Sequence, residues 1–142
     1  MRTRTTFRCT AIMLAFGAAL LLAVPCARAQ ERVIEVLADR DSRYKMSGLR
    51  TPEITVKAGE ALLLRVTARK GKTWNRDGSI HGFALLRAKD RTKVDGWSLL
   101  FRPGTEEFHL IAPSEPGEYI VVCTVICSED HEGMNMKFTV LP

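Results

Sequence analysis

Short runs in which apolar and polar residues alternate recur between residues 34 and 140. Because successive side chains of a strand point to opposite faces of a sheet, this alternation is typical of strands with one buried face. The apolar positions are Ile34, Val36 and Ala38; Ile54 and Val56; Leu62, Leu64, Val66 and Ala68; Phe108, Leu110 and Ala112; and Met136, Phe138 and Val140. No apolar pattern of helical period persists for ten residues after residue 29. The chain is therefore predicted to be all-β, a sandwich or barrel.

Glycine-containing dipeptides that favour turns separate these runs. They are Ser47-Gly48, Ala58-Gly59, Asp77-Gly78, Asp95-Gly96, Pro103-Gly104 and Pro116-Gly117. Their short spacing predicts antiparallel strands joined by tight connections. The sequence shows no internal repeat, linker or low-complexity tract, so a single domain is expected.

The N-terminal segment has the layout of a secretory signal peptide. Three arginines lie within the first eight residues, an apolar run follows at residues 10–24, and the motif Ala-Arg-Ala stands at residues 27–29. The run is shorter than the roughly 20 residues that a membrane-spanning helix needs. We expect residues 1–29 to be a cleaved signal, leaving a domain of residues 30–142 in the periplasm or outside the cell. Membrane contact is expected only if the signal stays uncleaved.

Cleavage changes both the charge and the cysteine content of the chain. Residues 1–29 hold four arginines and no acidic residue, so 17 basic and 16 acidic residues remain. A nearly neutral chain without a dense basic cluster gives no electrostatic basis for binding nucleic acid. Cys123 and Cys127 are the cysteines that remain.

These two cysteines lie in the stretch CTVICSEDHEGM, together with His131 and Met134. Thiolate and thioether sulfur are soft donors and imidazole is intermediate, a set that favours copper or zinc over calcium and magnesium. The methionine favours copper, because four-ligand zinc sites rarely use thioether sulfur and a lone Cys-x3-Cys lacks the second pair of a zinc ribbon. A structural disulfide is the alternative. It would close only a small ring and would leave the histidine and methionine unexplained.

The predicted strands GEYIVVCTV and NMKFTVL flank this stretch, at residues 117–125 and 135–141. The ligand loop is therefore expected between two anchored strand ends.

The stretch resembles the ligand loop of the binuclear copper A (CuA) domain of the cupredoxins, found in cytochrome c oxidase subunit II and nitrous-oxide reductase. That loop reads Cys-x3-Cys-x3-His-x2-Met, which residues 123–134 match position for position. The CuA domain takes a further histidine from an upstream strand, and His81 in IHGFAL is similarly placed. The resemblance covers about residues 54–141. It implies a cupredoxin-like Greek-key β-sandwich or barrel.

The resemblance also implies a ligand set for two copper ions. Cys123 and Cys127 would bridge both ions, with His81 on one copper and His131 on the other. Met134 and the main-chain carbonyl of residue 125 would be weak axial ligands. Subunit II usually has glutamate where this chain has Val125, but a carbonyl ligand does not depend on its side chain.

The function that this ligand set implies is electron transfer by an exported copper protein. Its partners would be a cytochrome c or a terminal oxidase or reductase, for which the chain could be the module through which electrons enter. A copper chaperone or thiol reductant would assist assembly, because an oxidising compartment tends to join the two thiols. Two alternatives stay open: delivery of copper to an apo-oxidase, and a mononuclear site that uses one cysteine. No Ser-His-Asp pattern appears, so catalysis by this chain alone is not expected.

Several other residues allow two interpretations. Glu129, Asp130 and Glu132 place three negative charges in the ligand loop, which is either solvated surface or a means of steering a basic redox partner. Trp74 and Trp97 are expected to pack in the core or a loop, with an electron path as the alternative.

Overall fold

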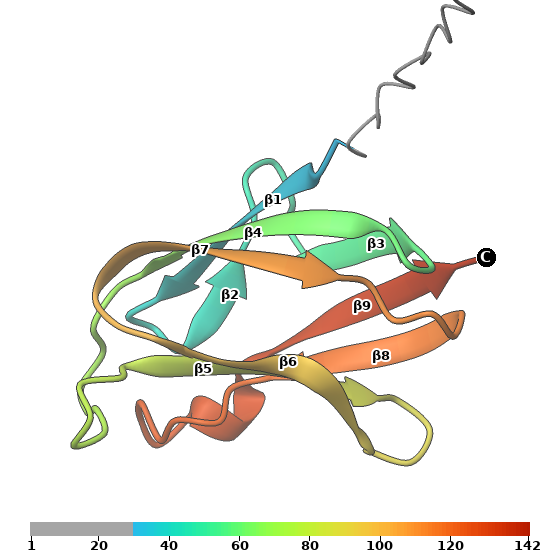
Figure 1. Ribbon diagram of the computed structural model, residues 1–142. Helices are drawn as coiled ribbons and strands as arrows, with labels where there is room; N and C mark the ends of the chain where they lie inside the picture. Colours follow the sequence, from blue (N-terminus) through green and yellow to red (C-terminus); the bar gives the residue numbers. More distant parts are fainter. Residues whose placement is uncertain (1–29) are drawn as a thin grey trace, which may run out of the picture.

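The structure, a computed structural model, describes residues 30–142 and consists of two β-sheets that enclose one core (Figure 1). The predicted signal peptide lies outside the described residues. One sheet has the order β2-β1-β4-β7 and the other β3-β9-β8-β5-β6. The strands are β1 (Arg32–Asp39), β2 (Arg43–Lys45), β3 (Glu53–Lys57), β4 (Ala61–Ala68), β5 (His81–Arg87), β6 (Lys93–Phe101), β7 (Gly104–Ile111), β8 (Gly117–Val122) and β9 (Asn135–Leu141). The predicted all-β sandwich is confirmed. Within residues 30–142 no helix has the length and apolar character to cross a bilayer.

The four-stranded sheet is built on the predicted alternation. In β4 every second side chain is buried, and β1 buries Ile34, Val36 and Ala38 toward the same core. β1 and β4 run parallel, with Val36 opposite Val66, and β4 pairs antiparallel with β7. The period-two pattern thus sets which face of these strands is buried.

The five-stranded sheet carries the ends of the predicted ligand loop. β9 coincides with the predicted strand at residues 135–141, and β8 pairs antiparallel with it. β8 ends at Val122, three residues before the predicted end, so Cys123 already lies outside the strand. β5 shows no alternation, because its first five residues, 81–85, are all buried.

The turn predicted at Asp95-Gly96 is wrong, because these residues lie inside β6. Gly96 has a φ of 77°, and the pairing of β5 with β6 shifts register between Ala84 and Leu86. A left-handed glycine serves a β-bulge as well as a turn, so the dipeptide alone did not distinguish them. The chain reverses earlier, where Arg87 N–H donates to the Thr92 carbonyl at 2.9 Å.

Aromatic side chains fill the centre of the sandwich. Phe83 packs against Tyr44, Trp97 and Phe101 with ring centroids 5.7 to 6.2 Å apart, and Trp97 meets Phe138 edge-on at 5.2 Å. The predicted packing role of Trp97 is therefore confirmed. Trp74, by contrast, is 55% exposed.

Candidate metal centre

Residues 123–134 form the loop that joins β8 to β9, at the end of the sheets opposite the C-terminus (Figure 1). The loop includes a short 3-10 helix, η1 (His131–Gly133). Cys123 N–H donates to the Met134 carbonyl at 3.1 Å, which closes the loop at its base. The two anchored strands thus hold both ends of the predicted ligand segment.

Three of the predicted ligands come together at this end. One ligand atom each from His81, Cys123 and Cys127 lies within 4.8 Å of the other two. The His81 and Cys127 side chains are fully buried, Cys123 is partly buried, and both cysteines are free thiols. Two sulfurs and an imidazole nitrogen in one buried cluster form a soft donor set suited to copper.

The hydrogen bonding of His81 leaves one ring nitrogen available. Nε2 lies 2.9 Å from the Arg69 carbonyl, which can only accept, so Nε2 carries the proton. Nδ1 is buried and has no hydrogen-bond partner. Burial lowers the pKa of His81, which keeps the ring neutral. A neutral ring fixed through Nε2 with a bare Nδ1 lone pair is the arrangement expected of a metal ligand.

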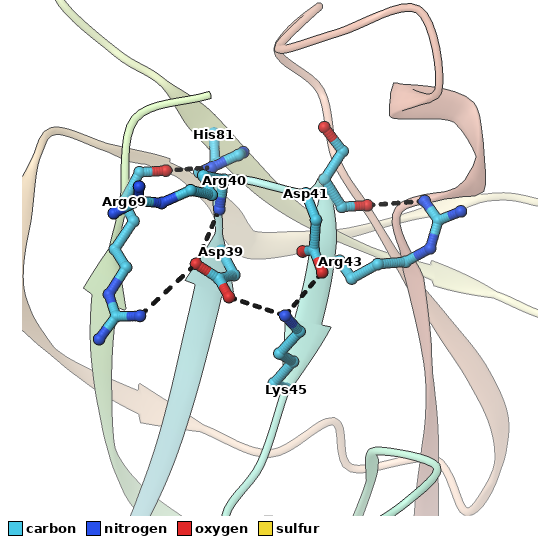
Figure 2. A network of polar contacts seen from close by, with 8 residues as sticks. Asp39, Arg40, Asp41, Arg43, Lys45, Arg69 and His81 are labelled. Atoms are coloured by element: carbon cyan, nitrogen blue, oxygen red, sulfur yellow. Dashed lines mark hydrogen bonds and ion pairs between the residues drawn. The ribbon is translucent and has the colours of Figure 1, made fainter. Parts of the chain in front are cut away.

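Arg69 is itself held at the end of β1, where its guanidinium lies 3.7 Å from the Asp39 carboxylate (Figure 2). Arg69 N–H donates to the Ala38 carbonyl at 2.9 Å, continuing the parallel pairing of β1 and β4. The Asp39 carboxylate accepts from Lys45 Nζ at 2.7 Å and from Arg40 N–H at 2.9 Å. The hydrogen bond from Lys45 is the main reason that the pKa of Asp39 is lowered. The four-stranded sheet therefore positions the carbonyl that binds His81. The two cysteines, by contrast, follow β8 of the five-stranded sheet.

Cys123 lies where β8 ends. Its sulfur accepts a hydrogen bond from Gly82 N–H at 3.4 Å and lies 3.3 Å from the Val125 carbonyl oxygen. Burial raises the pKa of the Cys123 thiol to about 11. Because metals bind thiolate, a metal entering this site displaces the thiol proton.

The two predicted axial ligands lie beside the cysteine sulfurs. The Val125 carbonyl, besides its contact with Cys123, accepts from Cys127 N–H at 2.8 Å. The Met134 side chain is fully buried, and its Sδ lies 4.0 Å from Cys127 Sγ. Each axial candidate thus contacts a different sulfur.

His131 is not part of the cluster formed by His81, Cys123 and Cys127. It begins η1, is partly exposed, and its Nδ1 lies 3.2 Å from the Ser128 carbonyl. Met134 N–H donates to the His131 carbonyl at 2.9 Å and closes the 3-10 turn. This turn sets the position of the His131 side chain.

A second loop, between β4 and β5, packs against the ligand loop. Thr73 N–H donates to the Cys127 carbonyl at 3.2 Å, and Thr73 Oγ1 donates to the Ile126 carbonyl at 2.5 Å. A Cβ added to Gly71 would lie 3.2 Å from the Cys127 carbonyl oxygen. This loop therefore buttresses the backbone that carries Cys127.

Several residues that shape the site have no recognisable pattern in the sequence. Gly82 approaches Thr124 so closely that an added Cβ would lie 2.9 Å from its backbone nitrogen. Ser42, in the turn between β1 and β2, is buried with its Oγ 3.3 Å from Cys127 Sγ. Neither residue belongs to a sequence motif, because a glycine after a histidine and a serine in a turn are common in β proteins. Their roles follow only from the contacts that they make in the folded protein.

No protein-family model matches this sequence, and no curated protein matches it either. Solved structures do resemble the chain. A dithionite-reduced auracyanin from Roseiflexus castenholzii aligns with a TM-score of 0.52 and 19% identity over 81% of this chain and 100% of that one. Rusticyanin from Thiobacillus ferrooxidans aligns at 0.53 and 17%, over 79% of each chain. A chain of a heme-copper terminal oxidase dimer aligns at 0.52 and 17%, over 78% of this chain and 65% of that one. At these identities the similarity concerns the fold, which is that of the cupredoxins.

Proposed function

We propose that this protein binds copper at the loop between β8 and β9 and carries single electrons. The observation that carries the proposal is the buried, unpartnered Nδ1 of His81, on a residue that clusters with two free thiols within 4.8 Å. An unpaired buried acceptor is costly, and a metal ligated there removes the cost. The auracyanin and rusticyanin neighbours support the proposal, since auracyanin A is described as a "blue" copper protein and rusticyanin as a copper protein.

Copper, when bound, supplies the one-electron couple. The protein's part is to keep the ligands nearly still between oxidation states, so that little reorganisation accompanies transfer. Here the ligands lie at strand ends: His81 begins β5, Cys123 follows β8 and Met134 precedes β9. The hydrogen bond that His81 Nε2 donates to the Arg69 carbonyl and the one that Gly82 N–H donates to the Cys123 sulfur restrict the two ligands further.

We further propose the binuclear form of the site, with Cys123 and Cys127 shared by two ions. The clustering of both sulfurs supports it, because a mononuclear site needs only one of them. The contacts of Val125 and Met134 with different sulfurs are also consistent with one axial ligand for each ion. His131 would complete the set by exchanging its contact with Ser128 for the metal. The mononuclear alternative is supported by the "blue" copper neighbour.

Copper loading tests both forms. The reduced protein of residues 30–142 is titrated with copper, and its metal content, optical spectrum and paramagnetic spectrum are recorded. We expect two coppers per chain, a purple colour and one unpaired electron shared by both ions. One copper with a blue spectrum would reject the binuclear form but keep the copper carrier. No bound copper would reject the proposed function. Rapid exchange of bound copper to a chelator would favour the copper-delivery alternative.

The cellular setting belongs to the same proposal. The predicted signal peptide supports export to the periplasm or beyond, and the structural similarity to a terminal oxidase chain supports an oxidase as redox partner. Two free thiols so close together could oxidise before copper arrives. A thiol reductant or copper chaperone is therefore proposed as an assembly partner.

The acidic loop is proposed to steer a basic cytochrome toward the metal. Glu129, Asp130 and Glu132 are all exposed on the ligand loop. Replacing the three by Gln, Asn and Gln should slow association with a basic cytochrome c by roughly tenfold at low salt and flatten the salt dependence of the rate. Stopped-flow measurements over a range of ionic strength check this.

The matched control neutralises three exposed acids at the opposite end of the sandwich: Asp90, Glu115 and Glu118. It changes the net charge equally, and the comparison is made at about 0.1 M salt, where exposed charges further apart than about 10 Å are largely screened, so that it should slow association less than the loop variant. Equal slowing by both triple variants would exclude local steering. Faster association of the loop variant would instead indicate an acidic partner, attracted by Lys70 and Lys72 on the neighbouring loop.

A further inference from the structure

We propose that Ser42 is a positioning residue that raises the reduction potential of the copper site by donating a hydrogen bond to the Cys127 sulfur. The inference rests on the proposed function. Ser42 Oγ lies 3.3 Å from Cys127 Sγ, within the distance of a hydrogen bond to sulfur. The serine is 1% exposed, so water does not compete for this contact. The two residues are 85 positions apart and lie in connections that belong to different sheets, Ser42 between β1 and β2 and Cys127 between β8 and β9.

The direction of the hydrogen bond follows from the chemistry of its neighbours. A metal-bound cysteine is a thiolate and can only accept, so the Ser42 hydroxyl donates to it. The oxygen of Ser42 then accepts from the Ser128 hydroxyl, 2.6 Å away. The oxygen of Ser128 in turn accepts from Asp130 N–H at 3.1 Å. The three hydrogen bonds therefore all point toward the sulfur, and aligned bonds of this kind polarise one another.

The backbone of Ser42 is in a disfavoured conformation. Its φ is 56°, in the left-handed region that glycine adopts freely and serine does not. The turn is held there by two hydrogen bonds: Ser42 N–H donates to the Asp39 carbonyl at 3.1 Å, and the Arg43 guanidinium donates to the Ser42 carbonyl at 2.8 Å. Glycine would remove the strain but also the hydroxyl. Strain held in place by surrounding contacts is typical of functional sites.

The effect on the potential has a definite sign. With copper bound, an added electron would increase the negative charge on the cysteine sulfurs, so a hydroxyl that donates to sulfur would stabilise the reduced state more than the oxidised one. Hydrogen bonds to ligand sulfur are an established means by which proteins tune metal potentials. The other sulfur, on Cys123, accepts from a backbone amide at a longer 3.4 Å. Ser42 thus donates the shorter of the two hydrogen bonds to sulfur. Because its donor is a side chain, a substitution can remove it.

The test compares Ser42→Ala and Ser42→Gly with the copper-loaded wild-type domain. Both variants lose the hydroxyl, but only glycine relieves the left-handed strain. We expect both to favour the oxidised state by about tenfold, which is 59 mV for a one-electron couple. The optical band that arises from sulfur-to-copper charge transfer should shift in both. Ser128→Ala should shift the potential in the same direction by less, since it keeps the donor and removes only its support.

Thermal unfolding of the apo-proteins distinguishes an effect on stability from an effect on the reduction potential. Ser42→Gly should unfold at a higher temperature than Ser42→Ala, because glycine relieves the backbone strain. A wild-type potential in Ser42→Gly with a lowered one in Ser42→Ala would assign the effect to strain and overturn the inference. Variants that load copper normally and keep the wild-type potential would also overturn the inference, because this result is expected if Cys127 stays a free thiol. The proposed function would then stand. If the wild-type domain takes up no copper, the function fails and the inference falls with it.

Discussion

Replacing Cys127 by serine should lower the affinity for copper by more than about 100-fold, beyond the range reported for loss of outer-shell partners. The thiolate is a soft anionic donor, whereas the serine hydroxyl is neutral and hard. Because oxygen is smaller than sulfur and keeps the same shape, the apo-protein should retain its fold. Copper content and affinity, measured with a competing chelator, check the expectation.

Cys123→Ser is the matched variant for this experiment. In a binuclear site both substitutions abolish the shared-electron signal, since both sulfurs bridge the ions. In a mononuclear site one of the two substitutions is nearly silent. Two coppers with a shared electron in Cys127→Ser would show that the ligand assignment is wrong. Circular dichroism of each apo variant shows whether a loss of copper merely reflects unfolding.

Gly82→Ala should disrupt both the stability of the domain and the metal site. An added Cβ would lie 2.1 Å from the Thr124 hydroxyl and 2.9 Å from the Thr124 backbone nitrogen. Relief of the second contact requires a backbone shift in the segment next to Cys123. We expect a loss of about 3 kcal/mol, the upper end for overpacking, and a melting temperature lower by roughly 10 °C or more. Copper affinity should fall as well, because Gly82 follows His81 and donates to the Cys123 sulfur.

Thr124→Ala provides the control for the clash. Thr124 is exposed, so this substitution alone should be nearly neutral. In combination with Gly82→Ala it removes the hydroxyl contact but not the backbone contact, so only partial rescue is expected. Urea unfolding of the two single variants and the double variant measures the coupling. A fully stable Gly82→Ala would show that the loop after β8 is free to move and does not hold Cys123 rigidly.

The sequence predicts those parts of the fold that depend on local pattern. Alternation located β1, β3, β4, β7 and β9, because each has one face toward the core. It could not locate β5, whose first residues are buried on both sides, and it could not recognise the bulge at Gly96, since turns and bulges use the same glycine conformation. The joining of these strands into two sheets is a tertiary property.

The candidate site divides in the same way. Cys123, Cys127, His131 and Met134 are candidate ligands because of their spacing within one loop, and the structure brings the two cysteines, but not His131, into one cluster with His81. The Arg69 carbonyl and the Ser42 hydroxyl have no such pattern, because they meet His81 and Cys127 only after the two sheets pack together. Backbone carbonyls and turn serines occur throughout any β protein, and burial beside a ligand is what distinguishes these two. Contacts such as these can therefore be recognised only in the three-dimensional structure.

The pairing of β3 with β9 bears on how the protein acquires its native state. These strands run parallel, with Glu53 opposite Lys137, so the first part of the domain must find the last before the second sheet closes. Contacts so remote along the chain form late and slow folding. The two thiols, four positions apart, meet in the unfolded polypeptide long before His81 and Ser42 reach them. The interval before the sandwich closes is therefore when these thiols are most exposed to oxidation.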